Sequence, residues 1–416
     1  MHTVTRFSRI CVVGMGYIGL PTSAVFADNG IDVVGVDVNP AAVDSINRGE
    51  PHIVEPELDV LLRKVVQAGK LRATLAPEPA DAFIIAVPTP FRGDHEPDLS
   101  YIAAAAASVA PVLGKGNLVI LESTSPIGTS EQLSRWLAAH RADLSFPHQT
   151  GELSDIRIAH CPERVLPGQI LREVVQNDRI IGGLTRKCAQ AATALYRIFV
   201  KGQIHLTNAR TAEMAKLTEN AFRDVNIAFA NELSLICDRL RINVWELIRL
   251  ANQHPRVNIL NPGPGVGGHC IAVDPWFIVA ADPENSRLIR TAREVNNSKP
   301  RFVIEKVRAH AAKLKQPVIA CLGLSYKANV DDLRESPALE IVAELARQKV
   351  GEILVVEPHV NALPKELAEL GVTLADFDQA TEKANILVLL VDHASFLTVD
   401  HDVVKDKIVV DTRGAW

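Results

Sequence analysis

The sequence predicts an α/β protein with two doubly wound lobes joined by a long central helix and a helical middle region. Short apolar runs alternate with helix-like segments at both ends of the chain, as in parallel sheets that are buried on both faces. Between them, from about Thr211 to Arg241, apolar residues recur at spacings of three and four. That spacing predicts one long helix.

Each expected strand is a short apolar run bounded by turn residues. The first lobe is predicted to contain strands at 9–13, 32–36, 82–87, 117–121 and 156–159. A stretch dense in Gly and Pro, 261–269, separates the long helix from a second helical pattern at 285–297. The last lobe is predicted to contain strands at 317–322, 352–356, 386–391 and 407–411, with helices at 337–348 and 363–370.

Composition narrows the class of protein. The 416 residues are 47% hydrophobic and 22% charged, with a net charge of −5, which is typical of an ordinary globular chain of two to three domains. No basic run interleaved with aromatic residues predicts nucleic-acid binding. The longest apolar run, 386–391, is far below the ~18–20 residues that span a bilayer. We therefore expect a protein that contacts neither nucleic acid nor membrane.

The cysteines predict a reducing compartment. Six are scattered along the chain and no two form a Cys-x-x-Cys pair, so neither disulfides nor a metal framework is expected. The strand at 9–13 leaves no room for a preceding secretory signal. Together these observations predict a cytoplasmic protein without a bound metal.

A glycine-rich turn follows the first predicted strand. The run 14–19 reads Gly-x-Gly-x-x-Gly, with Tyr17 and Ile18 in its variable positions, and it opens a helix. Such glycines permit a tight turn and close approach to a pyrophosphate. Asp37 ends the second strand 18 residues after Gly19, where a carboxylate accepts a hydrogen bond from a ribose 2′-OH and repels a 2′-phosphate. We interpret 14–19 and Asp37 as an NAD site, the alternative being a simple packing turn.

Thr89 and Thr124 follow the strands at 82–87 and 117–121. Both therefore belong to the carboxyl edge of the sheet, where open α/β folds bind ligands, and both are candidates for the cofactor site. The alternative is that they are turn residues or helix caps.

The loop 263–275 places a thiol and a carboxylate close together in the sequence. Cys270 follows four glycines, and Asp274 lies four residues further on. A thiolate is a good nucleophile toward a carbonyl carbon, more so where a cation or a helix N-terminus lowers its pKa. The alternative, a small buried hydrophobe, suits Cys11 and Cys321 better than Cys270. His269 next to the thiol is interpreted as a structural or supporting residue.

Three polar residues share a face of the long helix. Lys216, Asn220 and Arg223 lie at i, i+4 and i+7 beside the apolar stripe. A solvated face is the ordinary interpretation of such a strip. A lysine with an amide one turn away also suits the stabilisation of an alkoxide, which makes the strip a candidate for an active site.

The chain as a whole resembles the UDP-glucose/GDP-mannose dehydrogenase family. The resemblance rests on motifs at 14–21, 161–165, 212–220, 263–275 and 323–337. Pro-Glu-Arg-Val at 162–165, with Gly-Gly-His-Cys-Ile-Ala-Val-Asp-Pro-Trp-Phe at 267–277, is most similar to the subgroup of UDP-N-acetyl-D-mannosamine dehydrogenases. Members that act on UDP-glucose carry a second acidic residue after Pro-Glu, where this chain has Arg164 and Val165. That departure favours an N-acetylated hexosamine.

This resemblance implies an architecture and a reaction. It implies an NAD-binding Rossmann domain over 1–208, a central helical domain over 209–300 that carries the contact of a homodimer, and a Rossmann-like domain for the UDP-sugar over 301–416. It also implies four-electron oxidation of the C6 alcohol of a UDP-N-acetylhexosamine, expected to be UDP-N-acetyl-D-mannosamine, to the carboxylate, with two NAD per turnover.

The resemblance also implies residue roles. Cys270 matches the nucleophile that forms a thiohemiacetal and then a thioester, Asp274 the base for hydrolysis, and Lys216 and Asn220 the groups that stabilise oxyanions. Glu163 matches a further carboxylate for acid/base or water-positioning work. Residues that match binding positions are Tyr326, Lys327 and Gly267 for the sugar nucleotide, Arg334 for the NAD pyrophosphate, Arg256 for a contact across the dimer, and Arg164, Val165, His254 and Arg223 for the substrate's N-acetyl or pyrophosphate groups.

Three alternatives stay open at this point. The C2 epimer, UDP-N-acetylglucosamine, is a possible substrate of the same chemistry. A non-catalytic sugar-nucleotide-binding protein would keep both lobes without needing Cys270, Lys216, Asn220 and Asp274. A simpler dehydrogenase would stop after one hydride transfer and form one NADH per substrate.

Overall fold

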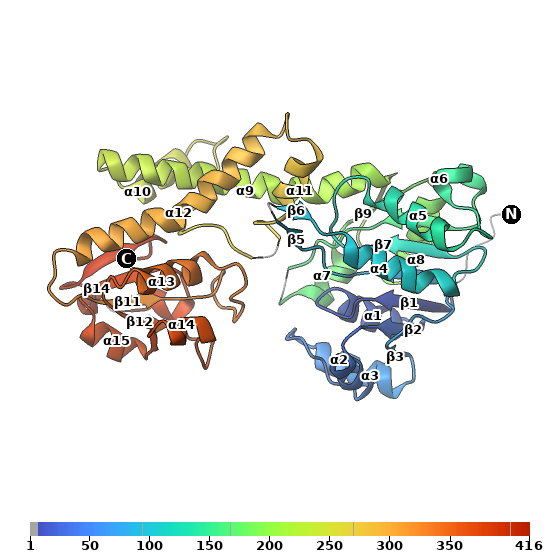
Figure 1. Cartoon of the computed structure of the whole chain (residues 1–416), viewed down its shortest axis with the longest axis horizontal. Helices are drawn as coiled ribbons and strands as arrows, with labels where there is room; N and C mark the ends of the chain where they lie inside the picture. The colour runs from blue at the N-terminus through green and yellow to red at the C-terminus, as the bar shows by residue number, and fades with distance from the viewer. Residues whose placement is uncertain (1–6, 94, 167, 269, 400) are drawn as a thin grey trace. The chain divides into compact units, whose positions relative to one another are not determined.

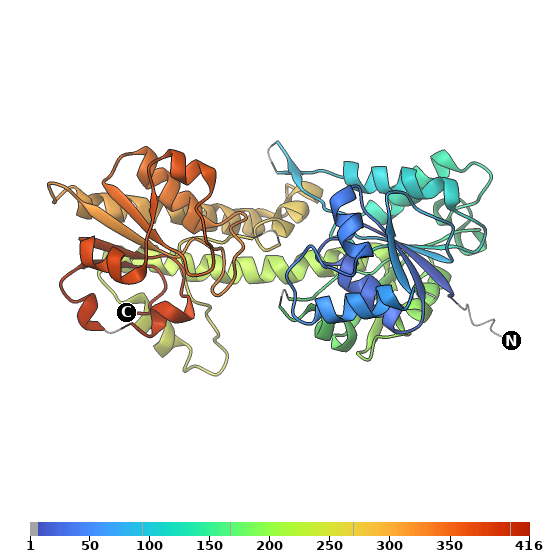
Figure 2. The ribbon, with the colours of Figure 1, turned by 90° about the horizontal axis from the view of Figure 1, so that it is seen from below.

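The computed structural model describes residues 7–93, 95–166, 168–268, 270–399 and 401–416, without the side chain of residue 401. The chain forms two compact units, and the boundary between them lies within helix α9 (Ala209–Leu240), between Thr218 and Glu219. Each unit holds one main sheet with helices on both faces (Figures 1 and 2). The predicted fold class, two doubly wound sheets with a helical middle region, is confirmed. The domain limits at 208 and 300 stay predictions.

The sheet of the first unit has the strand order β10-β9-β8-β7-β4-β1-β2-β3. All five predicted strands are present, two of them with the predicted limits. The strand expected at 82–87 ends at Ile85, and the one expected at 156–159 is shifted by one residue. The strands are β1 (Arg9–Val13), β2 (Asp32–Val36), β3 (Leu71–Thr74), β4 (Ala82–Ile85), β7 (Leu118–Leu121), β8 (Arg157–His160), β9 (Arg179–Gly183) and β10 (Ile204–Asn208).

Neighbouring strands of this sheet run parallel except for β8 and β9, which pair antiparallel. The sequence did not reveal β3, β9 and β10. Strands β3 and β10 form the two edges of the sheet and are only partly apolar, and β9 ends in two glycines. These three strands lack the continuous apolar run by which buried parallel strands are recognised.

Helices cover both faces of this sheet. Apolar side chains of α1, α3, α7 and α8 pack on one face, and those of α4 and α5 pack on the other. The helices of this unit are α1 (Gly19–Asp28), α2 (Pro40–Asn47), α3 (Leu58–Gln67), α4 (Ser100–Val109), α5 (Thr129–His140), α6 (Pro147–Thr150), α7 (Ile170–Gln176) and α8 (Arg186–Tyr196). A short hairpin, β5 (Phe91–Arg92) with β6 (Glu96–Pro97), follows β4.

The start of α9 is anchored in the first unit by Glu213. Its fully buried carboxylate accepts the backbone N–H of Gly128 at 2.6 Å and both the N–H and the hydroxyl of Ser130, at 2.8 and 2.7 Å. These donors lie at the N-terminus of α5, where a negative charge is stabilised by free amides.

The second unit has a wholly parallel sheet in the order β13-β12-β11-β14-β15. Helices α12 and α13 pack on one face, while α15 packs on the other. The elements are β11 (Val318–Leu322), α13 (Pro337–Arg347), β12 (Glu352–Val356), α14 (Lys365–Glu369), β13 (Thr373–Leu374), α15 (Phe377–Lys383), β14 (Ile386–Leu389), α16 (Ala394–Leu397) and β15 (Ile408–Asp411). All four predicted strands are present, whereas β13 was not predicted.

The middle region is helical as predicted. It contains α9, α10 (Val244–Ala251), α11 (Asp274–Ala281) and the start of α12 (Arg287–Ala311). The helix predicted over 285–297 continues through Pro300 to Ala311, which was not expected because proline removes a backbone donor. A buried ion pair, Arg293 Nη1 to Asp224 Oδ1 at 2.7 Å, ties α12 to α9.

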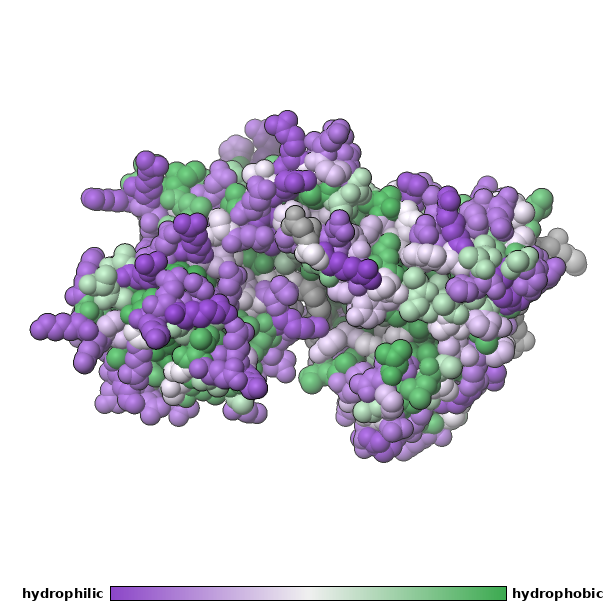
Figure 3. All heavy atoms as spheres, in the orientation of Figure 1, coloured by the Kyte–Doolittle hydropathy of each residue, from purple (hydrophilic) through white to green (hydrophobic). Residues whose placement is uncertain are grey.

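Charged and polar side chains cover much of the face shown in Figure 3, as expected for a chain with 22% charged residues. Within the described ranges, none of the helices combines the length and apolar character that a bilayer crossing requires.

Candidate active site

The glycine turn after β1 has three glycines with three different constraints. Gly14 has φ +96°, and a Cβ there would lie 2.5 Å from the carbonyl oxygen of Ala86. A Cβ on Gly19 would overlap the carbonyl oxygen of Gly14. A Cβ on Gly16 would meet nothing within 4 Å. The chain itself therefore requires glycine at 14 and 19, whereas the space at Gly16 suits close approach of a ligand phosphate.

Asp37 holds this turn with one carboxylate oxygen and the segment after β2 with the other. Oδ2 accepts the backbone N–H of Met15 at 3.1 Å, and Oδ1 accepts that of Asn39 at 2.9 Å. Ile18 lies at the N-cap of α1 without a capping side chain, so the first amides of α1 face the turn. This arrangement fits a pyrophosphate at the helix N-terminus and a ribose at Asp37, as predicted for NAD. Tyr17 beside them is 38% exposed.

Thr89 and Thr124 are brought together. The hydroxyl of Thr89 donates to the backbone carbonyl of Thr124 at 2.5 Å, which joins the loops after β4 and β7. Ser123 adds a second link, from its hydroxyl to the carbonyl of Val87 at 2.7 Å. Two hydrogen bonds therefore join the loops at the carboxyl edge of the sheet, where both threonines were predicted to lie. Neither threonine serves as a helix cap.

Glu163 lies just beyond the end of β8. Its side chain is 9% exposed and pairs with Arg179 Nη2 at 3.1 Å, and its Oε1 accepts the backbone N–H of Arg164 at 2.6 Å. The side chain of Arg164 donates to the carbonyl of Asp178, and Val165 is half-buried beside it. Burial raises the pKa of the nearby Cys161 thiol to about 12, so this cysteine is not a nucleophile.

Cys270 is the exposed cysteine of the chain, whereas the other five thiols are buried. It begins the turn that leads into α11, and its carbonyl oxygen accepts the backbone N–H groups of Val273 and Asp274 at 3.0 and 2.8 Å. Asp274 opens α11 and is 2% exposed. The side-chain amide of Asn220 donates to Asp274 Oδ2 at 2.5 Å. Lys216 lies one turn earlier on α9 and is half-buried.

The glycines before Cys270 are explained by packing against the segment 326–337. A Cβ on Gly267 would overlap the carbonyl oxygen of Glu335, and one on Gly268, at φ +81°, would lie 2.9 Å from the Tyr326 ring. A Cβ on Gly265 would lie 2.9 Å from Pro337. The loop that carries the thiol therefore lies flat against Tyr326, which is also a predicted binding residue.

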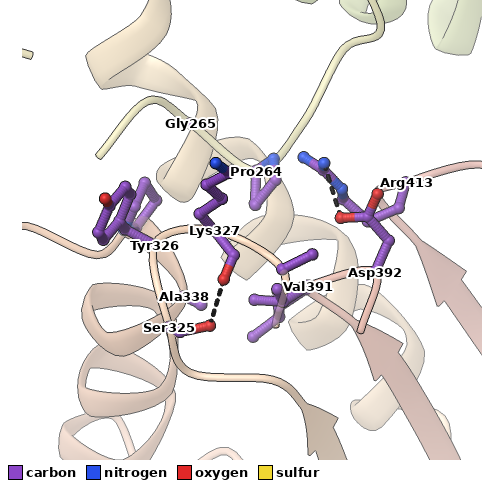
Figure 4. Close-up of a pocket in the computed structure, with 12 residues that line it drawn as sticks. Pro264, Gly265, Ser325, Tyr326, Lys327, Ala338, Val391, Asp392 and Arg413 are labelled. Atoms are coloured by element: carbon purple, nitrogen blue, oxygen red, sulfur yellow. Dashed lines mark hydrogen bonds and ion pairs between the residues drawn. The ribbon is translucent and has the colours of Figure 1, made fainter. Parts of the chain in front are cut away.

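Beside this loop, the second unit has a narrow pocket (Figure 4). Tyr326 and Lys327 line it, as do Arg413 and Asp392, which form an ion pair at 2.7 Å. Arg413 was not predicted from the sequence. It follows β15, and Asp411 fixes the turn by accepting the N–H groups of Arg413 and Gly414 at 2.7 and 2.8 Å. A basic residue two positions after the end of a parallel strand was the signal in the sequence that could have indicated it.

Buried groups support the segment that carries Tyr326 and Lys327. Glu357 Oε2 accepts the backbone N–H groups of Leu324 and Ser325 at 2.7 and 3.1 Å and lies 3.1 Å from His393 Nε2. Although burial opposes it, hydrogen bonds from His393 and the backbone lower the pKa of the Glu357 carboxyl. His393 Nδ1 in turn accepts the N–H of Asn329 at 3.0 Å.

Four other predicted binding residues are exposed. Arg223 lies on α9, and His254 and Arg256 lie in the turn after α10, where His254 Nδ1 accepts the N–H of Arg256 at 3.3 Å. Arg334 forms a two-point ion pair with Asp332, at 2.9 and 2.6 Å. Their binding roles stay predictions. His269 and Pro167 lie outside the described residues.

The doubly wound sheet and its glycine turn define a dinucleotide-binding protein. The chain belongs to the UDP-glucose/GDP-mannose dehydrogenase family. Residues 8–200 match its NAD-binding domain, 210–298 its central domain, and 320–416 its UDP-binding domain. The family resemblance, the dehydrogenase class and the cofactor, NAD, are thereby confirmed.

Several named proteins are similar over nearly the whole chain. The NDP-N-acetyl-D-galactosaminuronic acid dehydrogenase of Ralstonia nicotianae is 64% identical over 99% of this chain and 96% of its own. The UDP-N-acetyl-D-mannosamine dehydrogenase of Campylobacter jejuni is 61% identical over 96% of this chain and 98% of its own. The solved structure of the Pyrococcus horikoshii UDP-D-ManNAc dehydrogenase has a TM-score of 0.87 at 43% identity, covering 98% and 96% of the two chains.

Proposed function

We propose that the protein oxidises the C6 alcohol of UDP-N-acetyl-D-mannosamine to the carboxylate in two hydride transfers to NAD. The observation that carries the proposal is the exposed thiol of Cys270, presented by a glycine loop one turn before the buried carboxylate of Asp274. The relatives named UDP-N-acetyl-D-mannosamine dehydrogenase, 59–61% identical, support this choice of substrate.

Cys270 makes the second oxidation possible. When bound, NAD accepts one hydride from each oxidation step. After the first step the C6 carbon is an aldehyde, which has no hydroxyl from which a second hydride transfer can proceed. Addition of the thiol forms a C–S bond and a C–OH group, so the thiohemiacetal can lose its remaining C6 hydride and become a thioester. Water then replaces sulfur at C6 and releases the carboxylate and the thiol.

Asp274 and its neighbours suit the steps that move protons. A buried carboxylate acts as a general base for the water that attacks the thioester, and the Asn220 amide fixes its orientation at 2.5 Å. Lys216, one turn away on the same helix, supplies a positive charge for the oxyanion that forms at C6. Glu163 serves as a further acid/base or water-positioning carboxylate.

The pocket of the second unit suits the nucleotide part of the substrate. Lys327 and Arg413 line it with cations that match the two negative charges of a diphosphate, and Tyr326 offers an aromatic face. The ion pair with Asp392 holds Arg413 in place.

The state of the protein in the cell is part of the proposal. We expect a homodimer, in which Arg256 reaches the partner's substrate, because the resemblance places an arginine there. Sedimentation of the purified protein would show the dimer. We expect a cytoplasmic location, which fits reduced thiols and the use of NAD, and cell fractionation would test it.

The decisive experiment counts NADH per sugar. With limiting UDP-N-acetyl-D-mannosamine we expect two NADH per molecule and a uronic acid product. One NADH with an aldehyde product would overturn the thioester route. Cys270→Ser should lose steady carboxylate formation while still binding NAD and UDP.

A second candidate substrate follows from the Ralstonia relative, whose name refers to a galacto-configured sugar. The same count with UDP-N-acetyl-D-galactosamine and UDP-N-acetyl-D-glucosamine decides among the three sugars. The substrate proposal fails if either of these is turned over and the manno epimer is not.

A further inference from the structure

Four buried side chains meet at the carboxyl edge of the first unit's sheet and form what we call the Arg179 cluster: Arg179, Glu122, Glu163 and Tyr196. Glu122 directly follows β7, and Glu163 follows β8 by three residues. Tyr196 is the last residue of α8. All four residues are buried, so solvent does not separate their charges.

Strand direction explains why Arg179 reaches this edge. Because β9 runs antiparallel to β8, its first residue lies where β8 ends. His160 pairs with Gly182, and extending this register by three residues in each direction places Arg179 opposite Glu163. A parallel β9 would have put the arginine at the other edge of the sheet.

The two carboxylates share this one guanidinium unequally. Arg179 Nη2 contacts Glu163 Oε2 at 3.1 Å, whereas Nη1 contacts Glu122 Oε1 at the longer distance of 3.4 Å. Glu163 Oε1 also accepts the N–H of Arg164 at 2.6 Å. Glu122 Oε1 accepts the hydroxyl of Tyr196 at 3.0 Å, but its Oε2 is buried without a hydrogen-bond partner among the described residues.

One positive charge cannot stabilise two ionised carboxylates in a dry site. An ionised Glu122 would leave a charged oxygen buried and unpartnered, which costs more than a neutral one. Burial and the neighbouring Glu163 raise the pKa of Glu122, while Arg179 opposes the shift. Each oxygen of Glu163 has a hydrogen-bond donor, so a negative charge is stabilised more on Glu163 than on Glu122.

The other groups around the cluster carry no charge that changes this balance. Burial raises the pKa of Cys161 to about 12 and that of Tyr196 well above its usual value, so both are neutral. Burial lowers the pKa of His160 on β8 to about 3, so its imidazole is neutral as well. Further polar contacts are made by Arg179, which donates to the Val174 carbonyl and to Cys161 Sγ, the latter at 3.7 Å, and by the Arg164 guanidinium, which donates to the Asp178 carbonyl.

We propose that Glu122 holds a proton in the working enzyme, so that Arg179 gives its charge to Glu163 and keeps that carboxylate ionised and oriented. Arg179 and Glu122 are then positioning residues. This inference rests on the proposed role of Glu163 in the reaction. Ionisation of Glu122 at high pH would draw Arg179 away and lower the activity.

A direct test locates the proton by NMR. Carboxyl resonances of protein labelled with ¹³C at the glutamate side chain are followed with pH, and the signals of Glu122 and Glu163 are assigned by their loss in Glu122→Gln and Glu163→Gln. We expect Glu122 in its protonated form and Glu163 ionised at pH 6. An ionised Glu122 at that pH would overturn the proposal, whichever sugar the enzyme uses.

Kinetics give an independent readout. The glutamine of Glu122→Gln is neutral at every pH, so the alkaline decline of kcat should move upward by at least one pH unit. Glu131→Gln removes a half-buried carboxylate that is paired with Arg210 outside the cluster; it is the matched control and should keep the wild-type profile. An unchanged profile in Glu122→Gln, with an unchanged melting temperature, would contradict the proposed role. Absence of any turnover would instead count against the proposed function, and the NMR test would still stand.

Discussion

The side-chain amide of Asn220 donates a hydrogen bond to Asp274 Oδ2 at 2.5 Å, which joins the long helix α9 to the first residue of α11. The amide fixes one oxygen of a carboxylate that is 2% exposed. It does so without adding charge, which suits the base that we propose Asp274 to be.

Asn220→Asp should therefore disable hydrolysis more than oxidation. Two carboxylates at this distance cannot both be ionised, so the pKa of the pair is raised and the base is lost near neutral pH. We expect the steady rate to fall by about 10²–10⁴, the usual contribution of general-base catalysis, and a sugar thioester to accumulate on Cys270. Intact-protein mass after rapid quenching would detect that adduct.

Asn226→Asp, two turns further along α9, is the control and should retain the wild-type rate. Equal rates for Asn220→Asp and the wild-type protein would show that Asp274 is not the base.

Two alanine substitutions in the glycine turn should affect different properties, one the affinity for NAD and the other the stability of the fold. Gly16→Ala should fold with an unchanged melting temperature, because its Cβ meets nothing within 4 Å, yet bind NAD at least tenfold more weakly because the methyl group occupies the space for the phosphate. Gly19→Ala should lower the melting temperature, since its Cβ overlaps the Gly14 carbonyl oxygen. Calorimetric titration with NAD and thermal unfolding separate the two. Unchanged NAD affinity in Gly16→Ala would contradict the position of the pyrophosphate.

The pocket lined by Lys327 and Arg413 should bind UDP alone. Lys327→Met and Arg413→Leu should each weaken UDP binding by about 10–100-fold, because each removes a charged partner of a phosphate, worth about 1.5–3 kcal/mol. The salt dependence of binding should fall as well. Arg347→Met, an exposed arginine on α13 paired with Glu344, is the control. If UDP binds equally to all of these proteins, the nucleotide lies elsewhere.

His160 makes unfolding sensitive to acid. Burial lowers its pKa to about 3, against about 6.5 in an unfolded chain. Between these values the unfolded state takes up a proton that the folded state does not, so the free energy of unfolding falls as the pH falls, by about 1.4 kcal/mol per pH unit. From pH 7 to pH 5 this residue should cost about 2 kcal/mol.

His160→Phe keeps a ring at this position but cannot titrate. Urea unfolding of both proteins at pH 7 and pH 5 should show a smaller loss for the variant. An identical loss in the two proteins would mean that His160 does not set the acid sensitivity.

Many of the strands were predictable because each one corresponds to a local run of apolar residues in the sequence. Strands such as β1 and β2 are buried on both faces and therefore read as unbroken apolar runs. Strands β3, β9 and β10 lack such runs, and their pairing depends on contacts far along the sequence. No local pattern could show that β9 runs antiparallel.

The candidate site was predictable where its residues form a motif. The glycine turn and the loop before Cys270 have recognisable spacings, and their glycines are explained by close contacts or by a ligand's space. Arg179 and Glu357 carry no such motif, because each acts by meeting side chains from other elements. Only the folded chain brings those partners together.

Asp37 limits how freely the cofactor preference of this protein can be redesigned. A variant meant to accept a 2′-phosphate must remove this carboxylate, but the same oxygens hold the amides of Met15 and Asn39. Replacing Asp37 alone would remove the hydrogen bond that holds the glycine turn, so we expect both NAD and NADP to bind weakly to such a variant. A designer would have to supply two new acceptors for those amides together with the new positive charge.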